Sequence, residues 1–332
     1  MRTYLVPILL LTTIVGLSAG AEAASTHVLG ANKQTLSPST DTVNAGYYSP
    51  TALHVVDANL AAGNIKNGVT IFGIMGTYIA PPSTPTAGGE WVLVPGNLAF
   101  GTTDFYVMKY EAKSVGGVAT SQADVTPWAN INQTNAIAAC SALGDGYHLL
   151  TIPEVQTINR NIEAQTANWA NGTIGSLVSD GGGLKRGNVG ITDSASYDGA
   201  DPEFGTSRDV KGTHVLSNGG ILWDWSGNVR EWVYGAGANG TQGTPGGVTF
   251  DTGGTYEWNN AVLNEERPVL GPSNSSYTRL HGVGVYYGGG ATTNAVTWGG
   301  GWADGAFAGV FAFFAYTVPS YWTVDFGFRC GR

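Results

Sequence analysis

Residues 223–232 read Trp-Asp-Trp-Ser-Gly-Asn-Val-Arg-Glu-Trp and are the most specific stretch of the chain. The three tryptophans, Trp223, Trp225 and Trp232, are expected to pack in a core, because large aromatic rings contribute most when they are buried. Asn228 predicts a tight turn, since asparagine adopts left-handed backbone conformations more readily than most residues. A short apolar run at 220–224 leads into the stretch. We therefore expect this segment to lie inside a globular domain.

The remainder of the 332-residue chain is poor in charge and rich in glycine. Only 12% of the residues are charged, 42% are hydrophobic and 50 are glycine, whereas about a quarter of an ordinary soluble domain is charged. This composition excludes coiled coils and favours a loop-rich domain packed on aromatic rings. The 15 Lys and Arg against 24 Asp and Glu give a net charge of -9, so the basic surface that a nucleic-acid-binding protein needs is missing.

The first 23 residues have the pattern of a secretory signal peptide. Arg2 supplies the positive start, residues 5–17 are mainly apolar, and Ala21-Glu22-Ala23 is a small-residue cleavage site. The apolar run is short for a membrane span, although an uncleaved anchor stays open. We expect an exported protein, secreted or held at the cell surface.

Residues 24–80 are predicted to form a β-rich stalk or oligomerisation segment. Within it, 64–73 alternates in polarity, and Asn67-Gly68 is a hairpin signal. The segment resembles the short stalk modules of phage tail and surface proteins. It is too small to bury a core of its own, so we expect homo-oligomerisation through it. The proline-rich residues 81–88 are expected to be a linker.

From residue 89 onward an α+β domain is predicted. Strands are expected at 90–94 and 105–111, and helices at 135–143, ending at Gly144, and from 152 to about 164. Thr151 and Glu154 have the spacing of a capping box at the second helix. The chain has two cysteines, Cys140 and Cys330. In an oxidising compartment these form a disulfide or stay as two buried thiols.

Four segments of the chain occur in an order that indicates a family resemblance. They are 105–113, 138–154 with the run His148-Leu149-Leu150-Thr151-Ile152-Pro153-Glu154, the stretch 223–232, and Gly327-Phe328-Arg329-Cys330. Over residues 90–332 they resemble the formylglycine-generating-enzyme-like (sulfatase-modifying-factor) branch of the C-type lectin fold. The resemblance implies this fold for residues 89–332. It also favours a Cys140–Cys330 disulfide, because C-type lectin folds often join the first helix to the last strand.

The C-terminal region, about 298–330, resembles a more specific group of proteins. Gly299-Gly300-Gly301-Trp302 and the following glycines and aromatics are similar to the variable region of target proteins of diversity-generating retroelements. In that family, scattered positions of the last strands and loops are rewritten while glycines and core aromatics stay fixed. The resemblance implies that Trp302, Trp322 and Gly309 belong to the fixed scaffold. It implies a variable, ligand-binding surface made of Ala303, Asp304, Phe307, Phe313, Phe314, Tyr316, Thr317, Ser320, Tyr321 and Thr323.

Aromatic content supports a binding surface independently. Residues 307–322 hold many Phe, Tyr and Trp residues and no charge, and Tyr and Trp give large contact areas with few rotors to freeze. The alternative is a buried strand, because Phe311 and Phe313 alternate with Ala312 and Phe314 and one of those faces must point to the core.

Catalysis is not expected. Formylglycine synthesis needs two cysteines in the C-terminal part, where only Cys330 is present. The five histidines show no H-x3-H-x-E spacing for the iron site of a related branch. Calcium is the one cofactor that the resemblance implies. Its ligands would be the side chains of Asp224 and Glu231 with the carbonyls of Gly227 and Val229.

The sequence therefore predicts an exported protein that binds a ligand, a protein or glycan on another cell or virus, through a diversified C-terminal surface. Three alternatives stay open. They are a lectin-like protein of fixed specificity, a tail-fibre-like structural adhesin and a degenerate oxidase of the formylglycine-generating type.

Overall fold

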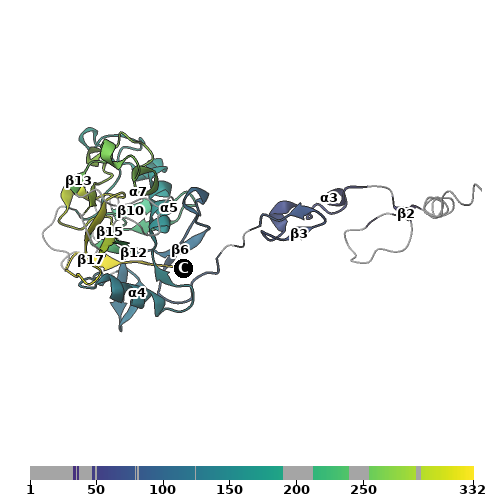
Figure 1. Ribbon diagram of the computed structural model, residues 1–332, viewed down its shortest axis with the longest axis horizontal. Coiled ribbons are helices and arrows are strands. Elements are labelled where there is room, and N and C mark those ends of the chain that lie inside the picture. The colour runs from purple at the N-terminus through teal and green to yellow at the C-terminus, as the bar shows by residue number, and fades with distance from the viewer. Residues whose placement is uncertain are drawn as a thin grey trace, which may run out of the picture. The chain divides into compact units, whose positions relative to one another are not determined.

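The computed structural model describes residues 33–34, 36, 47–48, 51–78, 80, 82–123, 125–189, 212–238, 254–288 and 293–332. The chain divides into two compact units, residues 1–80 and residues 81–332 (Figure 1). The predicted signal peptide, 1–23, lies outside the described residues. Within the described ranges, no helix has the length and apolar character needed to cross a membrane.

The described part of the first unit consists of short elements. These are β1 (Lys33–Gln34), β2 (Tyr47–Tyr48), α3 (Leu53–Val56), β3 (Thr70–Ile71) and β4 (Ile74–Met75). The β3–β4 hairpin turns at Phe72 and Gly73, whose φ angles are 48° and 80°. A two-residue hairpin turn of this kind needs positive φ at both central positions. Asn67-Gly68, predicted as the hairpin turn, lies instead in the turn before β3.

The second unit mixes helices with two sheets, as an α+β class requires (Figure 1). The larger sheet has the strand order β13 (Gly254–Tyr256), β14 (Tyr286–Gly288), β16 (Phe313–Thr317), β15 (Thr293–Trp298), β12 (Arg230–Ala238), β17 (Phe326–Phe328). The smaller sheet has the order β5 (Trp91–Val94), β6 (Phe105–Met108), β18 (Cys330–Gly331), β9 (His148–Leu149). Two separate hairpins are β7 (Ala112–Val115) with β8 (Val118–Ser121) and β10 (Thr213–Val215) with β11 (Ile221–Trp223).

Within the described residues, these sheets are accompanied by the α-helices α4 (Gln133–Ser141), α5 (Ile152–Glu163) and α7 (Arg267–Leu270). The capping box of α5 is confirmed, because Thr151 and Glu154 bond reciprocally across the first turn. Helix α4 begins two residues before its predicted start, because the side chain of Asn132 accepts a hydrogen bond from the Asn135 backbone N–H at 2.9 Å. It also ends before Gly144, with Ala142 as its C-cap.

The disulfide between Cys140 and Cys330 is present and joins α4 to β18. Both cysteines are fully buried. The resemblance therefore predicted the pairing correctly, and the alternative of two free thiols is wrong.

The stretch 223–232 lies in the core, as predicted. Trp223, Trp225 and Trp232 are 9%, 3% and 1% exposed. Asn228 has a φ of 62°, in the left-handed region. Its side-chain amide donates to the Glu111 carboxylate at 2.6 Å, so the turn and the core are specified by the same residue.

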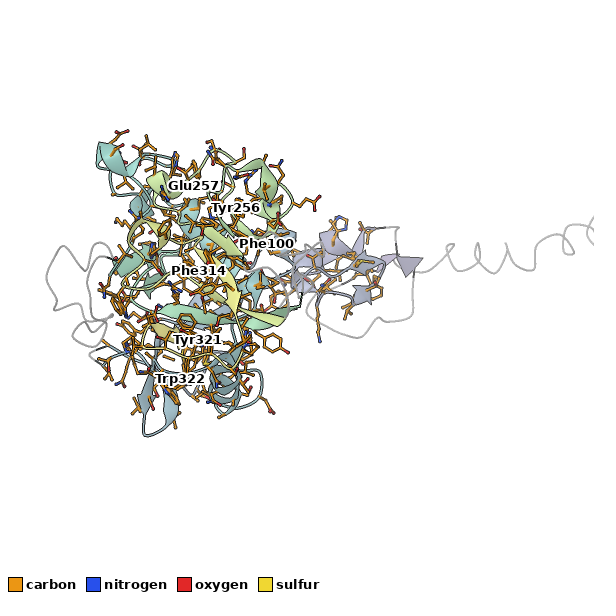
Figure 2. All side chains as sticks on the ribbon, turned by 60° about the vertical axis from the view of Figure 1, so that its left-hand side comes forward. Phe100, Tyr256, Glu257, Phe314, Tyr321 and Trp322 are labelled. Carbon is orange, nitrogen blue, oxygen red and sulfur yellow. A yellow bond between two sulfur atoms is a disulfide. The ribbon has the colours of Figure 1, made fainter. Side chains whose placement is uncertain are left out.

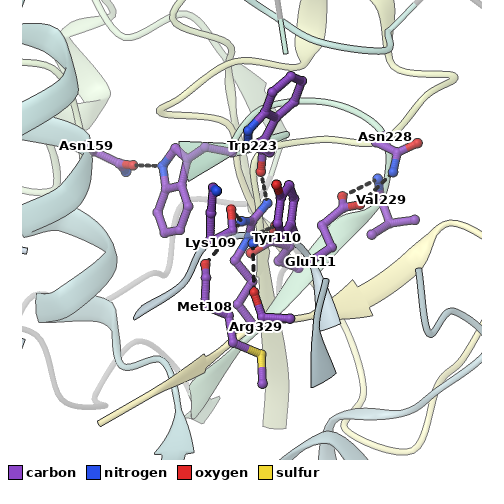
Figure 3. A network of polar contacts seen from close by, with 12 residues as sticks. Met108, Lys109, Tyr110, Glu111, Asn159, Trp223, Asn228, Val229 and Arg329 are labelled. Atoms are coloured by element: carbon purple, nitrogen blue, oxygen red, sulfur yellow. Dashed lines mark hydrogen bonds and ion pairs between the residues drawn. The ribbon is translucent and has the colours of Figure 1, made fainter. Parts of the chain in front are cut away.

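A buried polar network surrounds this stretch (Figure 3). Arg329 is fully buried and donates to the backbone carbonyls of Trp223 and Lys109 and, at 2.6 Å, to the Glu231 carboxylate. Glu111 accepts from Asn228 and, at 3.1 Å, from the backbone N–H of Val229. The network thus brings together the segments 105–113, 223–232 and 327–330, on which the resemblance depends.

The network is balanced in charge. Glu111, Lys113, Glu231 and Arg329 are two acids and two bases, and each is at most 7% exposed. Burial raises the pKa of Glu111, and the charges of Lys113 and Arg329 oppose that shift. Removing one member would leave an uncompensated buried charge, which is strongly destabilising. The network is therefore part of the scaffold.

Candidate ligand-binding surface

Two loops flank β16 in the sequence: residues 299–312 precede the strand and residues 318–325 follow it. At Gly300 and Gly309, the first loop packs directly against neighbouring residues. A Cβ at Gly309 would lie 2.3 Å from the backbone of Gly284 and Val283, and one at Gly300, whose φ is 78°, would lie 2.6 Å from Ala308. These two positions accept only glycine without a shift of the loop.

The second loop is held by its own backbone. The Thr323 carbonyl accepts from the Asn130 N–H at 3.1 Å, and the Asp325 carbonyl accepts from the Arg230 N–H at 2.7 Å. The Pro319 carbonyl accepts from the Gln133 N–H at 3.1 Å. None of these three bonds involves a side chain of the loop, so they can form whichever side chains the loop carries.

The ten residues predicted to form the surface fall into three groups by burial. Exposed residues are Ala303, Phe307, Tyr316, Ser320 and Tyr321. Partly buried residues are Asp304 and Thr323, and buried residues are Phe313, Phe314 and Thr317.

Three of the predicted residues are buried in β16. Successive side chains of a strand point to opposite faces, and Phe313 and Ala315 both belong to the main core cluster. Phe313 is fully buried, stacked on Tyr286 with a centroid distance of 5.3 Å. Phe313 was predicted at the binding surface, and that placement is wrong because its ring belongs to the core. Thr317, 7% exposed, pairs with Ala295 of β15 beyond a register shift in β16, so the alternation does not carry through to it.

The opposite face of β16 carries Phe314 and Tyr316. Tyr316 is 37% exposed, whereas Phe314 is 5% exposed because the Arg230 guanidinium covers its ring at 4.5 Å from the centroid. Figure 2 shows Phe314, Tyr321 and Trp322 in succession along the C-terminal domain. Phe311 is fully buried, but it lies in the turn before β16 and not in the strand that the alternative interpretation assumed.

The two tryptophans assigned to the scaffold differ. Trp302 is partly buried, and its backbone N–H donates to the Asn228 carbonyl at 2.9 Å, which ties the first loop to the stretch 223–232. Trp322 is 61% exposed. Together with Val318, Val324 and Tyr321, each about half exposed, it forms an apolar rim, and exposed apolar patches of this kind mark interaction sites.

A pocket of about 280 Å³ has Phe314 and Tyr316 of β16 in its lining. It is lined by Arg230, Thr255, Val285, Tyr287, Asp304, Phe307, Phe314 and Tyr316. Four of these, from Asp304 onward, were predicted from the sequence. The other four come from β12, β13, β14 and, for Val285, the residue just before β14, and they were missed because the strand order of the sheet brings them together.

Arg230 is the charged centre of the pocket. Its guanidinium donates to both carboxylate oxygens of Asp304, Nε to Oδ2 at 2.8 Å and Nη2 to Oδ1 at 2.5 Å. It also donates from Nη1 to the Tyr316 hydroxyl. Asp325 lies 3.7 Å from Nε. Burial opposes the charged form of Arg230, but the hydrogen bonds and charge of Asp304 outweigh it and raise the pKa of the guanidinium.

One of the carboxylates predicted to bind calcium already has a cationic partner. The Glu231 carboxylate accepts a hydrogen bond from the Arg329 guanidinium at 2.6 Å. Among the residues that the structure describes, no three His, Cys, Asp or Glu side chains gather to hold a metal ion. We derive no role for calcium.

No protein-family model and no curated protein sequence matches this chain. Among solved structures, the Major Tropism Determinant P3c variant is 16% identical, with a TM-score of 0.36 over 68% of this chain and 50% of that one. The Treponema denticola variable protein 1 is 12% identical, with a TM-score of 0.33 over 72% of this chain and 90% of that one.

The structure titled CarF is 16% identical, with a TM-score of 0.32 over 73% of this chain and 97% of that one. This chain spans about half the length of the P3c and U1 tropism-determinant structures. At such TM-scores none of these likenesses decides the function of this chain.

Proposed function

We propose that this chain is an exported, non-catalytic ligand-binding protein. Residues 89–332 would form a C-type lectin-like domain of the formylglycine-generating-enzyme-like subtype. The ligand, a protein or glycan on another cell or virus, would contact the surface made of the pocket around Arg230, the exposed residues of 303–323 and the apolar rim. Residues of this surface would be diversified by a retroelement.

One observation carries the proposal: in the loops 299–312 and 318–325, the contacts that hold the backbone are distinct from the side chains that are exposed. Backbone hydrogen bonds, two obligatory glycines and the bond from the Gly301 N–H to Asp304 set the path, whereas Ala303, Ser320 and Tyr321 are exposed. A surface built in this way tolerates changes of side chain without a loss of fold, as diversification requires. Exposed Tyr and Trp side chains also supply the contact area that binding surfaces favour.

The test is to sequence the 3′ end of the gene in many clones from one natural population. We expect substitutions to cluster at Ala303, Phe307, Tyr316, Ser320 and Tyr321, while Gly300, Gly309 and Phe313 stay constant. An invariant 3′ end, or substitutions spread equally over buried and exposed codons, would contradict diversification and favour a protein of fixed specificity.

We propose that the N-terminal unit assembles with copies of itself. Ile65 is its one buried large apolar residue among those described, while Phe72 is 78% and Met75 68% exposed. A two-stranded hairpin is marginal in water on its own, so these side chains need a partner. Sedimentation of the mature chain should give an oligomer that Phe72→Ser with Met75→Ser converts to monomer. A monomeric unmodified chain would contradict self-assembly.

A further inference from the structure

The pocket holds a charged residue that comes from the scaffold. Arg230 begins β12 within the stretch 223–232, and its backbone N–H bonds to the Asp325 carbonyl. Its side chain is 13% exposed. The guanidinium therefore reaches the pocket from a position that does not move with the C-terminal loops.

Asp304 is itself held in place. Its Oδ2 accepts the Gly301 N–H at 2.7 Å, and its backbone carbonyl accepts the Phe307 N–H at 2.9 Å. The carboxylate is thus fixed by its own loop before it meets Arg230. Two parallel hydrogen bonds between a guanidinium and a carboxylate are among the strongest polar contacts in proteins.

These contacts use three of the five guanidinium N–H groups and place two carboxylates beside its charge. Asp304 takes Nε and Nη2, Tyr316 takes Nη1, and Asp325 lies beside Nε. Arg230 with Asp304 and Asp325 has one positive and two negative charges, a sum of -1. Nearby, Arg279 lies over the Phe307 ring and is paired with Glu257 at 3.1 Å, so it adds no free positive charge. An anionic group entering the pocket therefore meets a net negative charge.

We propose that residue 304 determines the charge class of ligand that this pocket accepts, by masking or releasing Arg230. With Asp304 the pocket accepts neutral or cationic groups and excludes carboxylates, phosphates and sulfates. With an uncharged side chain at 304 the same guanidinium becomes a donor for an anionic group, flanked by the aromatic rings of Tyr287, Phe314 and Tyr316. This inference rests on the proposed binding function and names its specificity determinant.

The experiment titrates benzoate, an aromatic carboxylate, into the full chain, with methyl benzoate as the uncharged probe of the same ring. Binding is read from the ¹⁵N–¹H signal of the Arg230 Nε–H, assigned by its loss in Arg230→Gln. We expect benzoate to bind Asp304→Asn on the order of tenfold more tightly than the unmodified chain, as one recovered charge-assisted contact of about 1.4 kcal/mol implies. Methyl benzoate should bind both equally.

Three variants provide controls. Asp325→Asn removes the more distant carboxylate and should give a smaller gain, and adding it to Asp304→Asn should increase the gain further. Asp145→Asn removes one exposed charge in the turn before β9 and should change nothing. Arg230→Gln in the Asp304→Asn background should abolish the gain.

The asparagine side chain keeps an oxygen for the Gly301 N–H, so the loop should stay folded. Asp304→Ser is the second variant if it does not. The inference is overturned if folded Asp304→Asn or Asp304→Ser binds benzoate no better than the unmodified chain, or if the gain persists without Arg230. It is also overturned if both variants unfold, since residue 304 would then be structural. Because the titration needs neither the natural ligand nor sequence variation, its failure and that of the proposed function are distinguishable.

Discussion

The stretch 223–232 and the C-terminal surface are both rich in aromatic residues, yet they use them in opposite ways. Trp232 is 1% exposed and its indole donates to a buried carbonyl, that of Ile131, at 2.8 Å. Trp322 is 61% exposed. In the first region the side chains of Trp225, Asn228 and Glu231 bond to partners from other segments. In the C-terminal surface, backbone hydrogen bonds hold the loops and several side chains are exposed. The same residue type is thus structural or available for binding according to what holds its backbone.

Breaking the covalent link of the scaffold should have the largest effect. The Cys140–Cys330 disulfide closes a loop of 190 residues, which in the chain-entropy model stabilises the fold by about 5 kcal/mol. We expect Cys140→Ala with Cys330→Ala to lower the free energy of unfolding in urea by an amount of this order. A loss below about 1 kcal/mol would mean that the bridge adds little to a scaffold held by the buried network.

Removing the charge at the centre of the buried network comes next. Arg329→Met leaves Glu231 without its partner in the interior, so we expect a loss of about 3–5 kcal/mol in the free energy of unfolding. The matched control is Arg279→Met, whose guanidinium is paired with Glu257 at a side-chain exposure of 42%. That variant should lose no more than about 1 kcal/mol. Equal losses would contradict the distinction between the two regions.

The scaffold should also respond to pH through His214. This histidine is fully buried, its Nε2 lies 3.0 Å from the Lys185 carbonyl, and burial lowers its pKa to about 4. The unfolded chain takes up a proton near pH 6.5 and the fold does not until about pH 4. Its contribution is therefore complete above pH 6.5, and about 3 kcal/mol is lost as the pH falls to 4.

His214→Gln should flatten that part of the stability profile measured by urea unfolding. His148 provides a contrast, since burial lowers its pKa but the hydrogen bond and charge of Glu154 outweigh this and raise it. Its contribution should instead be lost as the pH rises through the raised value. An unchanged profile in His214→Gln would show that the histidine is not buried as described.

Local signals predicted much of the scaffold. Thr151 with Glu154 predicted the start of α5, because the capping box is decided within one turn of helix. Asn67-Gly68 misled for the same reason, since a local turn signal does not say which strands pair on either side of it. Gly144 was likewise predicted as the C-cap of the first helix, whereas the C-cap of α4 is Ala142.

The binding surface was predicted only in part. Phe313 and Phe314 are adjacent in sequence, and which of them faces the core depends on the register of β16 with β14 and β15. Tyr287 and Thr255 enter the pocket through strand order, for which no sequence signal was present. Arg230 is part of the most specific motif, but nothing local indicated that it turns away from the buried network toward Asp304.

We expect the C-terminal surface to vary freely on a fixed scaffold. The most direct test randomises Ala303, Phe307, Ser320 and Tyr321 in one library and Phe311, Ala312, Phe313 and Trp232 in another, and measures the protease resistance of each variant. We predict that most single changes in the first library stay within about 0.5–1 kcal/mol of the unmodified chain, whereas most in the second lose 2 kcal/mol or more, roughly as surface and core substitutions do. Phe307 and Phe311, 42% and 0% exposed, are the matched pair. Equal loss of folded variants in both libraries would contradict the account.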